Sequence, residues 1–462
     1  MKKIKDNTNK KTNKIILESK KIIKEEKEKI RIEKKNIRKQ KLDKFKKTGI
    51  YKFFDRIISL FKSDKDTYSF SEVFTITLVS LIVGAFACFS VLMIFFGGKN
   101  YFKLSKDLDK FVDVYETLVD NYYDNINKEQ LVEEAINGMI SSVGDVYTSY
   151  TDTDGVDEFN ELVSGVYEGI GCTIQLQEDG VRIIEVFENS PSDKAGLKVN
   201  DIILKVDDIE VLSTTDIVSL SNYIKTEGGG KITMIISRDG EEKTVELKRD
   251  KVEMPVVNAT TYEKNGKKIG YMTISLFTSV ASKQFESKLR DLEKQNISGL
   301  VIDVRNNNGG YLTTVTDIVS QLLPKGSAIY QIEKNDKRVV TKDKTSTCRK
   351  YPIAVLVNGN SASASEILAA AIKESYHGFV VGTTTYGKGT VQQVKKLSDG
   401  SMIKYTIENW LTPDGNWIDN AGVEPTNEVE PTNEVEMTSD CYENPIIEND
   451  NQLQEALNLV SK

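Results

Sequence analysis

Histidine is almost absent from this sequence: His377 is the single one among 462 residues. One imidazole excludes zinc, di-iron and haem sites that need several histidine ligands from the same chain, so we expect no metal centre. It also allows a Ser-His-Asp triad only if His377 is itself the base. Cysteine is scarce as well, with four residues at scattered positions, and one of them, Cys88, lies inside an apolar run. The remaining three are an odd number, so we expect no structural disulfide.

Charge is unevenly distributed along the chain. Residues 1–70 hold 24 Lys and Arg against 10 Asp and Glu, while the whole chain carries −7, which leaves −21 on the remainder. A basic block before an acidic body could indicate a nucleic-acid-binding tail. The segment that follows it argues for a membrane instead, and we expect no nucleic-acid partner. The length itself predicts several domains, at roughly 150 residues each.

Residues 73–98 contain no charged side chain. These 26 mostly apolar residues exceed the roughly 20 that a helix needs to cross a lipid bilayer. A soluble core helix of this length would normally carry a polar stripe. A cleaved signal peptide has a short basic region, not one of about 70 residues. We therefore predict a transmembrane helix at 73–98. The Lys/Arg excess makes 1–72 a cytoplasmic arm, either solvated or touching anionic lipid, and places the rest outside.

Three regions follow the apolar run. Residues 99–164 show helical spacing of apolar side chains, broken at Gly144-Asp145, and predict a helical lead-in without obvious chemistry. Residues 165–250 alternate short β-rich runs with turns and contain one helix, 214–226. Residues 251–435 predict an α/β domain with a largely parallel sheet. Its expected strands are 269–274, 300–305, 353–358 and 379–384, and its expected helices are 281–295, 313–323 and 364–375.

The end of the chain carries a short duplication. The unit Val-Glu-Pro-Thr-Asn-Glu occurs at 423–428 and again at 429–434. Two copies are too few for a solenoid, so we interpret them as a duplicated acidic linker. Residues 436–462 form a C-terminal segment with a short helix predicted at 452–460.

The β-rich region carries a recognisable motif. Residues 190–197 (SPSDKAGL), followed by 199–203 (VNDII), resemble the PDZ domain signature, and 167–172 (YEGIGC) resemble that family's carboxylate-binding loop. Glycines in such a loop let several backbone N–H groups point at one anionic carboxylate, and the next strand pairs with the ligand peptide. The peptide-binding candidates are therefore Gly169, Ile170, Gly171 and Cys172.

Ser363 is the candidate nucleophile of the α/β region. It lies in residues 361–366 (SASASE), at a turn from a predicted strand into a predicted helix. Unpaired N–H groups and the helix dipole at such a turn favour a developing oxyanion. However, Ser363 and Glu366 also fit a capping box, which many inert helices use. From the turn alone, both interpretations stay open.

A nucleophilic serine needs a base. His377 ends the helix that the serine turn begins, about 14 residues away, which at 1.5 Å per residue is roughly 20 Å. Lys388, in 387–392 (GKGTVQ), is the remaining candidate. An exposed lysine with a pKa of about 10.4 would be protonated, but burial lowers that pKa. Gln392 would share a strand face with Lys388 and hold its amine. The alternative is a lysine in a surface turn.

Residues 382–389 nearly match the phosphate-binding P-loop, G-x-x-x-x-G-K-[ST]. Gly389 stands where a Ser or Thr should bind Mg²⁺, and a strand-like run follows instead of a helix. We therefore expect no nucleotide and no other cofactor.

Taken together, these segments resemble the carboxy-terminal processing peptidases, PDZ-containing serine proteases with a Ser/Lys dyad. The resemblance covers about residues 104–425 and the final helix. It implies an α/β catalytic domain with a crotonase- or Clp-protease-like sheet, into which the PDZ-like domain is inserted. It assigns Ser363 as nucleophile, Lys388 as base, Gln392 as the residue that positions the lysine, and the N–H groups of Gly309 and Ala364 as the oxyanion hole.

Together with the predicted span and its orientation, the resemblance implies a membrane-anchored extracytoplasmic endopeptidase that binds unfolded or C-terminally exposed proteins, and it is compatible with a homo-oligomer. In such an enzyme the rate should rise with pH as the lysine loses its proton. Two alternatives remain. The first is a non-catalytic PDZ scaffold that only binds C-terminal peptides, and the second is a related acyl-transfer enzyme acting on a small thioester.

Overall fold

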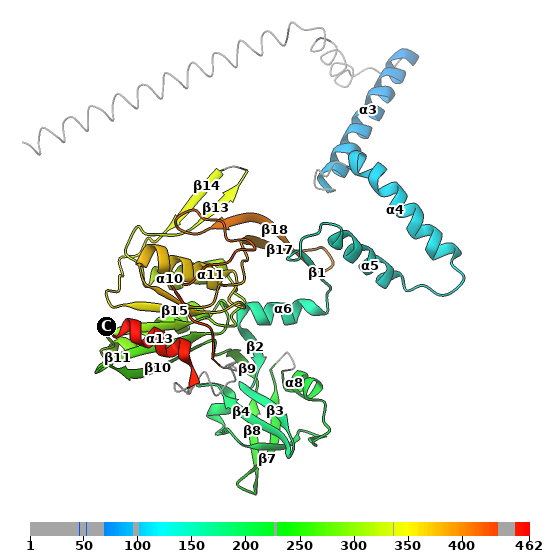
Figure 1. Cartoon of the computed structure of the whole chain (residues 1–462). Helices are drawn as coiled ribbons and strands as arrows, with labels where there is room; N and C mark the ends of the chain where they lie inside the picture. The colour runs from blue at the N-terminus through cyan, green and yellow to red at the C-terminus, as the bar shows by residue number, and fades with distance from the viewer. Residues whose placement is uncertain are drawn as a thin grey trace, which may run out of the picture. The chain divides into compact units, whose positions relative to one another are not determined.

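The computed structural model (Figure 1) describes residues 46, 52, 69–95, 101–225, 229–335, 337–432 and 449–462. Most of the basic arm predicted at 1–72, and residues 436–448 of the predicted C-terminal segment, therefore lie outside the described residues. The chain divides into two units, one ending at Ile126 and the other beginning at Asn127.

In the first unit, the helices with bounds among the described residues are α3 (Phe70–Phe95) and α4 (Tyr101–Asn121). Helix α3 overlaps the predicted span, and its Phe70–Val91 portion is long and apolar enough to cross a membrane. None of that portion is buried within the structure, and side chains such as Leu81 and Phe86 are exposed. Helix α3 therefore carries apolar side chains on its surface rather than in a protein core.

A six-stranded sheet forms the centre of the second unit. Its strands, in order across the sheet, are β10 (Val257–Lys264), β11 (Lys267–Ile274), β12 (Gly299–Asp303), β15 (Ile353–Val357), β16 (Phe379–Gly382) and β19 (Asn427–Glu428). Only β10 and β11 pair antiparallel, and every other neighbouring pair is parallel. The prediction of a largely parallel sheet is confirmed. Strand β19 comes from the first copy of the hexapeptide.

Both faces of this sheet are covered, as a parallel sheet requires. Leu300 and Ile302 pack in one apolar cluster with α9 (Ala281–Lys294), α10 (Leu312–Ser320) and α11 (Ala364–Ala370). Val301, which points to the opposite face, packs in another cluster with α13 (Asn451–Val460). Figure 1 shows α10 and α11 on one side of the sheet and α13 on the other.

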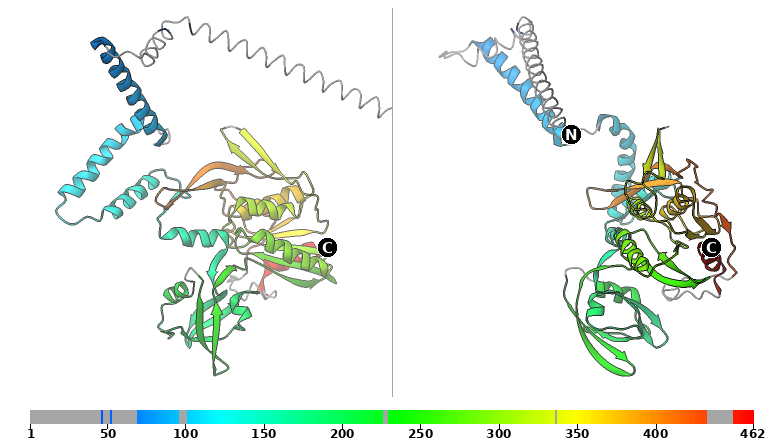
Figure 2. Two further views of the ribbon diagram at one scale, coloured as in Figure 1. Left: turned by 180° about the vertical axis from the view of Figure 1, so that it is seen from behind. Right: turned by 90° about the vertical axis from the view of Figure 1, so that its left-hand side faces the viewer.

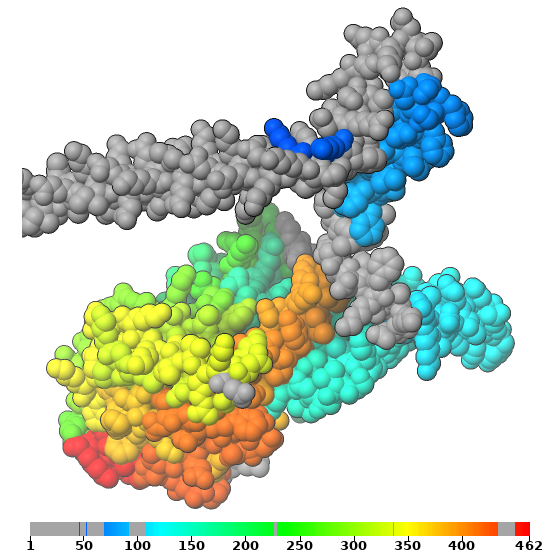
Figure 3. All heavy atoms as spheres, turned by 90° about the horizontal axis from the view of Figure 1, so that it is seen from above, coloured from blue at the N-terminus to red at the C-terminus, as the bar shows by residue number. Residues whose placement is uncertain are grey.

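A second, antiparallel sheet was not predicted. It joins β1 (Ser149–Thr151), β18 (Met402–Leu411), β13 (Ala328–Lys334) and β14 (Lys337–Lys342), and β17 (Thr390–Lys396) also pairs with β18. Figure 3 shows the β17–β18 region, in orange, beside the yellow β13–β14 hairpin. The lead-in is helical at α5 (Lys128–Ser141) and α6 (Gly155–Ser164), but between them it supplies β1. An early segment therefore pairs with a late one.

The two ends of the PDZ-like segment lie side by side, because β2 (Val166–Gly169) at its start pairs antiparallel with β9 (Asp250–Glu253) at its end. The elements between them, also seen from two further sides in Figure 2, are β3 (Cys172–Gln177), β4 (Gly180–Val186), α7 (Pro191–Lys194), β5 (Ile202–Val206), β6 (Ile209–Glu210), α8 (Ile217–Lys225), β7 (Lys231–Arg238) and β8 (Glu241–Lys248). They surround an apolar core of their own, which includes Val181, Ile183 and Ile203.

Candidate active site

Three serines lie where β15 leads into α11, two in the turn and Ser365 in the first turn of the helix, and they differ sharply. The hydroxyls of Ser361 and Ser365 are buried and donate to the carbonyls of Val304 and Asn307, each at 2.8 Å. Ser363 is only half-buried and has φ 54° and ψ −111°. A positive φ is uncommon for a residue with a side chain, and such strained conformations concentrate at active sites. The structure therefore sets Ser363 apart from its two neighbours.

Glu366 connects this turn to the lysine segment. The Ser363 N–H donates to Glu366 Oε2 at 2.7 Å, and the Lys388 N–H donates to the same oxygen at 2.9 Å. The other oxygen, Oε1, accepts the Gly387 N–H at 2.7 Å and the Thr385 hydroxyl at 2.6 Å. Glu366 is fully buried, so four donors satisfy a carboxylate that water does not reach. Burial raises the pKa of Glu366, and its hydrogen bonds act in the opposite direction.

The capping box foreseen from Ser363 and Glu366 is confirmed. In the sequence it competed with a catalytic interpretation of the serine. In the structure the same glutamate caps the helix and binds the main chain of Lys388, so the two interpretations do not exclude each other. The S-x-x-E spacing indicated the cap, but no local pattern indicated partners 21 and 22 residues further along.

Lys388 lies in a tight turn just before β17. A side chain on Gly387, which has φ +86°, would place its Cβ 2.9 Å from the nitrogen of Gly422. A Cβ on Gly389 would lie 2.8 Å from that of Asp419. The carbonyl of Lys388 accepts the indole N–H of Trp410 at 2.7 Å. The glycines thus allow the close backbone approach on either side of Lys388 that the sequence suggested.

The amine of Lys388 is half-buried and lies over an aromatic ring. Its Nζ is 4.5 Å from the centroid of Tyr147. Burial lowers the pKa of Lys388, the charge of Lys404 lowers it further, and Asp145 and Glu366 oppose both; the net result is a pKa below the usual value. Among the described residues, no hydrogen bond joins this amine to Ser363 or Gln392. The structure therefore brings the main chains of the two dyad candidates together, with the amine turned toward Tyr147.

Gln392 occupies a different environment from the one expected. Strand β17 begins at Thr390, and a bulge lies between Val391 and Gln392. The alternation along a strand therefore does not relate Gln392 to Lys388. The Gln392 amide donates to the hydroxyls of Thr390 at 2.9 Å and Thr406 at 3.2 Å. Thr406 in turn donates to Asp145 Oδ2 at 2.7 Å. Gln392 is thus linked to the lead-in turn that faces Lys388.

The two oxyanion candidates lie beside the serine turn. A Cβ on Gly309, which has φ +107°, would lie 2.9 Å from both the Ala362 oxygen and Ser363 Cβ, so its backbone touches the turn. The Gly309 N–H donates to Asn307 Oδ1 at 2.8 Å, and this bond would have to open before Gly309 could bind an oxyanion. Ala364 begins α11, so its N–H has no acceptor within the helix.

His377 lies where the sequence placed it, at the far end of the helix from Ser363. Helix α11 continues as a π-helical turn, η1 (Ala371–Tyr376), and His377 caps that turn in a left-handed conformation, exposed to solvent. The predicted helix 364–375 is therefore present, but its second half has wider π-type turns.

The PDZ-like segment carries a groove beside β3, which is an edge strand among the described strands of its sheet. A hollow of about 410 Å³ lies between β3 and α8, lined by Tyr167, Cys172, Thr173, Ile174, Phe187, Ile217, Val218, Ser221, Asn222, Lys225 and Met254. A Cβ on Gly171 would lie 2.4 Å from that of Ser190, so only glycine fits there. Gly169 belongs to β2, and Ile170 is buried. Of the four peptide-binding candidates, Cys172 lines the hollow, and burial raises its pKa to about 11.

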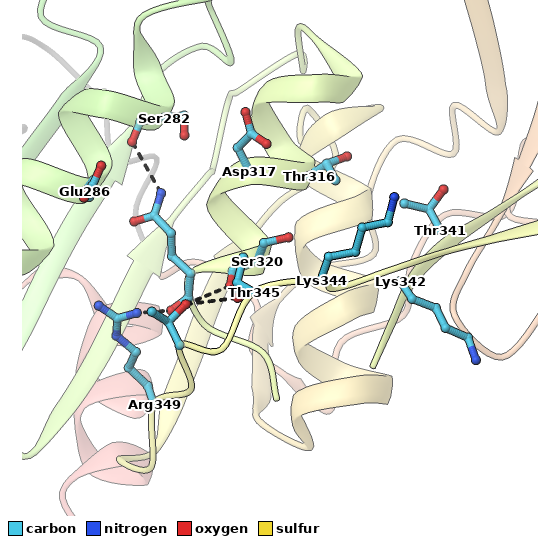
Figure 4. Close-up of a pocket in the computed structure, with 12 residues that line it drawn as sticks. Ser282, Glu286, Thr316, Asp317, Ser320, Thr341, Lys342, Lys344, Thr345 and Arg349 are labelled. Carbon is cyan, nitrogen blue, oxygen red and sulfur yellow. Dashed lines mark hydrogen bonds between the residues drawn. The ribbon is translucent and has the colours of Figure 1, made fainter. Parts of the chain in front are cut away.

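Another hollow, of about 560 Å³, lies beside α9 and α10 (Figure 4). Its lining is polar and includes Ser282, Asp317, Lys344 and Arg349, but none of the predicted site residues. The guanidinium of Arg349 is bound to Glu293 at 2.9 Å. This hollow therefore adds nothing to the serine–lysine constellation.

Known protein families match three parts of the chain. The model of peptidase family S41 matches residues 268–429, the PDZ domain model matches 169–248, and a model described as the activating protease CtpB N-terminal domain matches 97–155. The first covers the turns of Ser363 and Lys388, and the second covers the groove beside β3.

Curated relatives match over most of the chain. The chain is 39% identical to the carboxy-terminal processing protease CtpB of Bacillus subtilis over 324 residues, which are 70% of this chain and 67% of that protein. It is 33% identical to CtpA of the same organism over 365 residues, or 77% and 76% of the two chains. The solved photosystem II D1 C-terminal processing protease is 26% identical, with a TM-score of 0.43, over 73% of this chain and 88% of that one. By its sequence relatives, this chain belongs to the carboxy-terminal processing proteases of peptidase family S41.

Proposed function

We propose that this protease is anchored in the cell membrane and cleaves proteins outside the cytoplasm with a dyad of Ser363 and Lys388. The observation that carries the proposal is the single Glu366 oxygen that binds the N–H groups of both residues. It keeps the two main chains within about two hydrogen-bond lengths of each other. The lysine side chain is flexible, and the proposal requires its amine to approach the serine hydroxyl while it stays over the Tyr147 ring.

The chemistry would run through an acyl-enzyme. Neutral Lys388 takes the Ser363 proton while Ser363 Oγ attacks the substrate carbonyl, and the resulting ammonium protonates the leaving amine. Water then hydrolyses the ester with Lys388 again acting as base. Burial supports this role because it lowers the pKa of Lys388 and so raises the fraction of neutral amine. Gln392 would steady the surroundings of the lysine through Thr406 and Asp145.

The tetrahedral intermediate carries a negative oxygen that needs donors. The Ala364 N–H suits this role because it opens α11 without an intrahelical acceptor, and the helix dipole favours an anion there. Gly309 lies against the same turn and would add a second donor once its hydrogen bond to Asn307 opens.

Substrate capture would use the groove between β3 and α8. An extended peptide can pair with the free edge of β3, and its terminal carboxylate would bind the N–H groups of the 169–172 loop. Lys225 lines the same hollow, and its amine, which lies 3.5 Å from Glu161 Oε2, would have to leave that partner to bind the carboxylate. Unfolded proteins or proteins with an accessible C-terminus fit such a groove.

A single experiment tests both catalysis and capture. The full chain in detergent is given an unstructured protein in two forms, one with a free C-terminal carboxylate and one with a C-terminal amide. We expect faster cleavage of the carboxylate form. Ser363→Ala and Lys388→Ala should each lower cleavage by at least about 1,000-fold, because each removes a member of one catalytic unit.

His377→Ala is the matched control, since its side chain lies at the far end of the helix, and this variant should keep wild-type activity. Full cleavage by either dyad variant would overturn the dyad. Equal rates on the carboxylate and the amide would overturn C-terminal capture while leaving the dyad intact.

A further inference from the structure

The turn before β1 reaches the lysine of the proposed dyad, although its sequence gave no sign of chemistry. Tyr147, in this turn, places its ring face 4.5 Å from Lys388 Nζ. Tyr147 is half-buried and is separated by more than 200 residues of sequence from the lysine it contacts. The contact exists because β1 pairs with β18, with Ser149 opposite Lys404.

The turn is held rigidly enough to fix that ring. Asp145 Oδ1 accepts the Tyr147 N–H at 3.0 Å, and Oδ2 accepts the Thr148 hydroxyl at 2.6 Å. The same Oδ2 accepts the Thr406 hydroxyl at 2.7 Å, which ties the turn to β18. One carboxylate therefore shapes the turn and attaches it to the strand beside the lysine.

The phenol end of Tyr147 lies near Tyr386. Burial and the neighbouring Tyr386 raise the pKa of Tyr147 to about 12. The ring thus stays a neutral phenol at physiological pH. Tyr386 is itself anchored, because its N–H donates to the carbonyl of Ser361 at 3.0 Å. The backbone that carries the ring is held by Asp145, and the neighbouring Tyr386 is attached to the serine turn.

We propose that Tyr147 is a positioning residue for Lys388, whose ring holds the amine in the site and stabilises the ammonium that forms when Ser363 gives up its proton. This inference rests on the proposed dyad. In that step the Ser363 O–H bond breaks, an Nζ–H bond forms on Lys388, and the new cation lies against an aromatic face. An aromatic face attracts a cation through its quadrupole and has no such preference for a neutral amine.

Several charged groups also face Lys388, and they are unchanged by substitution at Tyr147. The charges that influence the pKa of Lys388 are Lys404 on β18, Asp145 in the lead-in turn and Glu366 in α11. Asp419 acts on Tyr147 and accepts the Gly389 N–H at 3.0 Å. Tyr386 is the remaining titratable neighbour of the ring. A neutral replacement of Tyr147 therefore isolates the contribution of the ring.

The test compares Tyr147→Leu with Tyr147→Phe in the full chain in detergent. Leucine keeps apolar bulk over the amine but removes the ring face, whereas phenylalanine keeps the face and removes only the hydroxyl. The apparent pKa of Lys388 is measured in two ways: from kcat/KM against pH, and from competitive acetylation of its amine followed by peptide mass spectrometry. The second measurement does not require proteolysis.

For Tyr147→Leu we expect the pKa of Lys388 to fall by about 0.5 to 1 unit in both measurements, since the ammonium loses its aromatic partner. The limiting kcat should fall about tenfold or more, because the amine is no longer held in place. Tyr147→Phe should keep the wild-type pKa. Tyr150→Leu is the matched control on the same segment, because the Tyr150 hydroxyl donates to Glu133. This variant should leave the pKa of Lys388 at its wild-type value.

An unshifted acetylation pKa in Tyr147→Leu would overturn the inference, as would a shift in Tyr147→Phe equal to that in Tyr147→Leu. If the dyad assignment itself is wrong, the result is different. The Lys388→Ala variant would then retain proteolysis, independently of the pKa values measured by acetylation. The two failures are therefore distinguishable.

Discussion

Glu366 connects the two segments of the candidate site. It can do so because its carboxylate has two oxygens that accept hydrogen bonds and is buried away from water. Each oxygen accepts two donors, and the donors come from both the nucleophile turn and the lysine turn. A buried carboxylate without such partners would be costly. With them, it fixes the relative position of two turns that lie more than 20 residues apart in sequence. This explains why one glutamate can be both a helix cap and a structural link of the site.

Lys404 offers a direct test of the electrostatics around Lys388. Its positive charge lowers the pKa of Lys388, so replacing it with the neutral Lys404→Met should raise that pKa. The acid limb of the kcat/KM profile would then move to higher pH, by about half a unit for a partly solvated pair. At pH values below the pKa of Lys388, the variant should therefore be about threefold less active than the wild type. At alkaline pH the two rates should converge. A pH series on a peptide substrate measures the shift.

Lys395→Met is the control for that series, because Lys395 lies exposed on the neighbouring strand β17. Its profile should match that of the wild type. A Lys404→Met profile that moves to lower pH, or does not move, would contradict the assigned influence of Lys404 on the lysine.

At the scale of elements, the sequence predicts those helices and strands whose own residues carry a clear pattern of apolar side chains and turns. Strands β11, β12, β15 and β16 were foreseen within a few residues, because they are short apolar runs bounded by turns. The π-type half of the α11 helix was not, since its apolar spacing also suits an ordinary helix. Strand β1 was missed because three residues at 149–151 carry no pattern of their own. They become a strand only through pairing with β18, about 250 residues later.

The same limit applies to the site. The glycines and the capping pattern mark the serine and lysine segments in the sequence, but only the resemblance to a family predicted them as a dyad. Tyr147 and Asp145 could not be found, because their importance depends on a long-range pairing that places them beside Lys388. Gln392 was foreseen as a residue near the lysine, but the bulge in β17 changes its neighbours.

The C-terminal helix α13 makes a prediction about stability. Asp450 caps this helix by accepting the Leu453 N–H at 2.9 Å, and it binds the buried guanidinium of Arg305 at 2.7 Å. Arg305 follows β12 and also pairs with Asp303 at 2.6 Å. Asp450→Ala would leave part of a buried cation without its partner, so we expect the free energy of unfolding to fall by about 3 kcal/mol.

Urea unfolding of the full chain in detergent measures this loss. The fluorescence of Trp410, which is fully buried in the core, reports the transition. Glu455→Ala in the same helix is the control and should change the midpoint little, since Glu455 is only half-buried. An Asp450→Ala midpoint equal to that of the wild type would mean that α13 does not depend on this contact.

At the scale of the whole molecule, helix α3 bears on which side of a membrane the rest of the chain occupies. Helix α3 carries only one charged residue, Glu72, and its apolar side chains are exposed. Exposed apolar surface on this scale is costly in water, so the helix requires a lipid environment or a partner. The basic excess before it favours retention of the N-terminus in the cytoplasm. The first hexapeptide, which forms β19 rather than a linker, and α13 would then lie on the outer side together with the proposed dyad.

This arrangement predicts opposite exposure of the two ends of the chain. With one epitope tag before residue 1 and another after residue 462, protease added to intact cells without an outer membrane should remove the C-terminal tag and leave the N-terminal tag protected. Permeabilised cells should lose both. Loss of the N-terminal tag without any protease would mean that the apolar segment is cleaved as a signal peptide. Protection of the C-terminal tag would place the catalytic unit in the cytoplasm and contradict the proposed topology, because the positive-inside bias would then have failed to set the orientation.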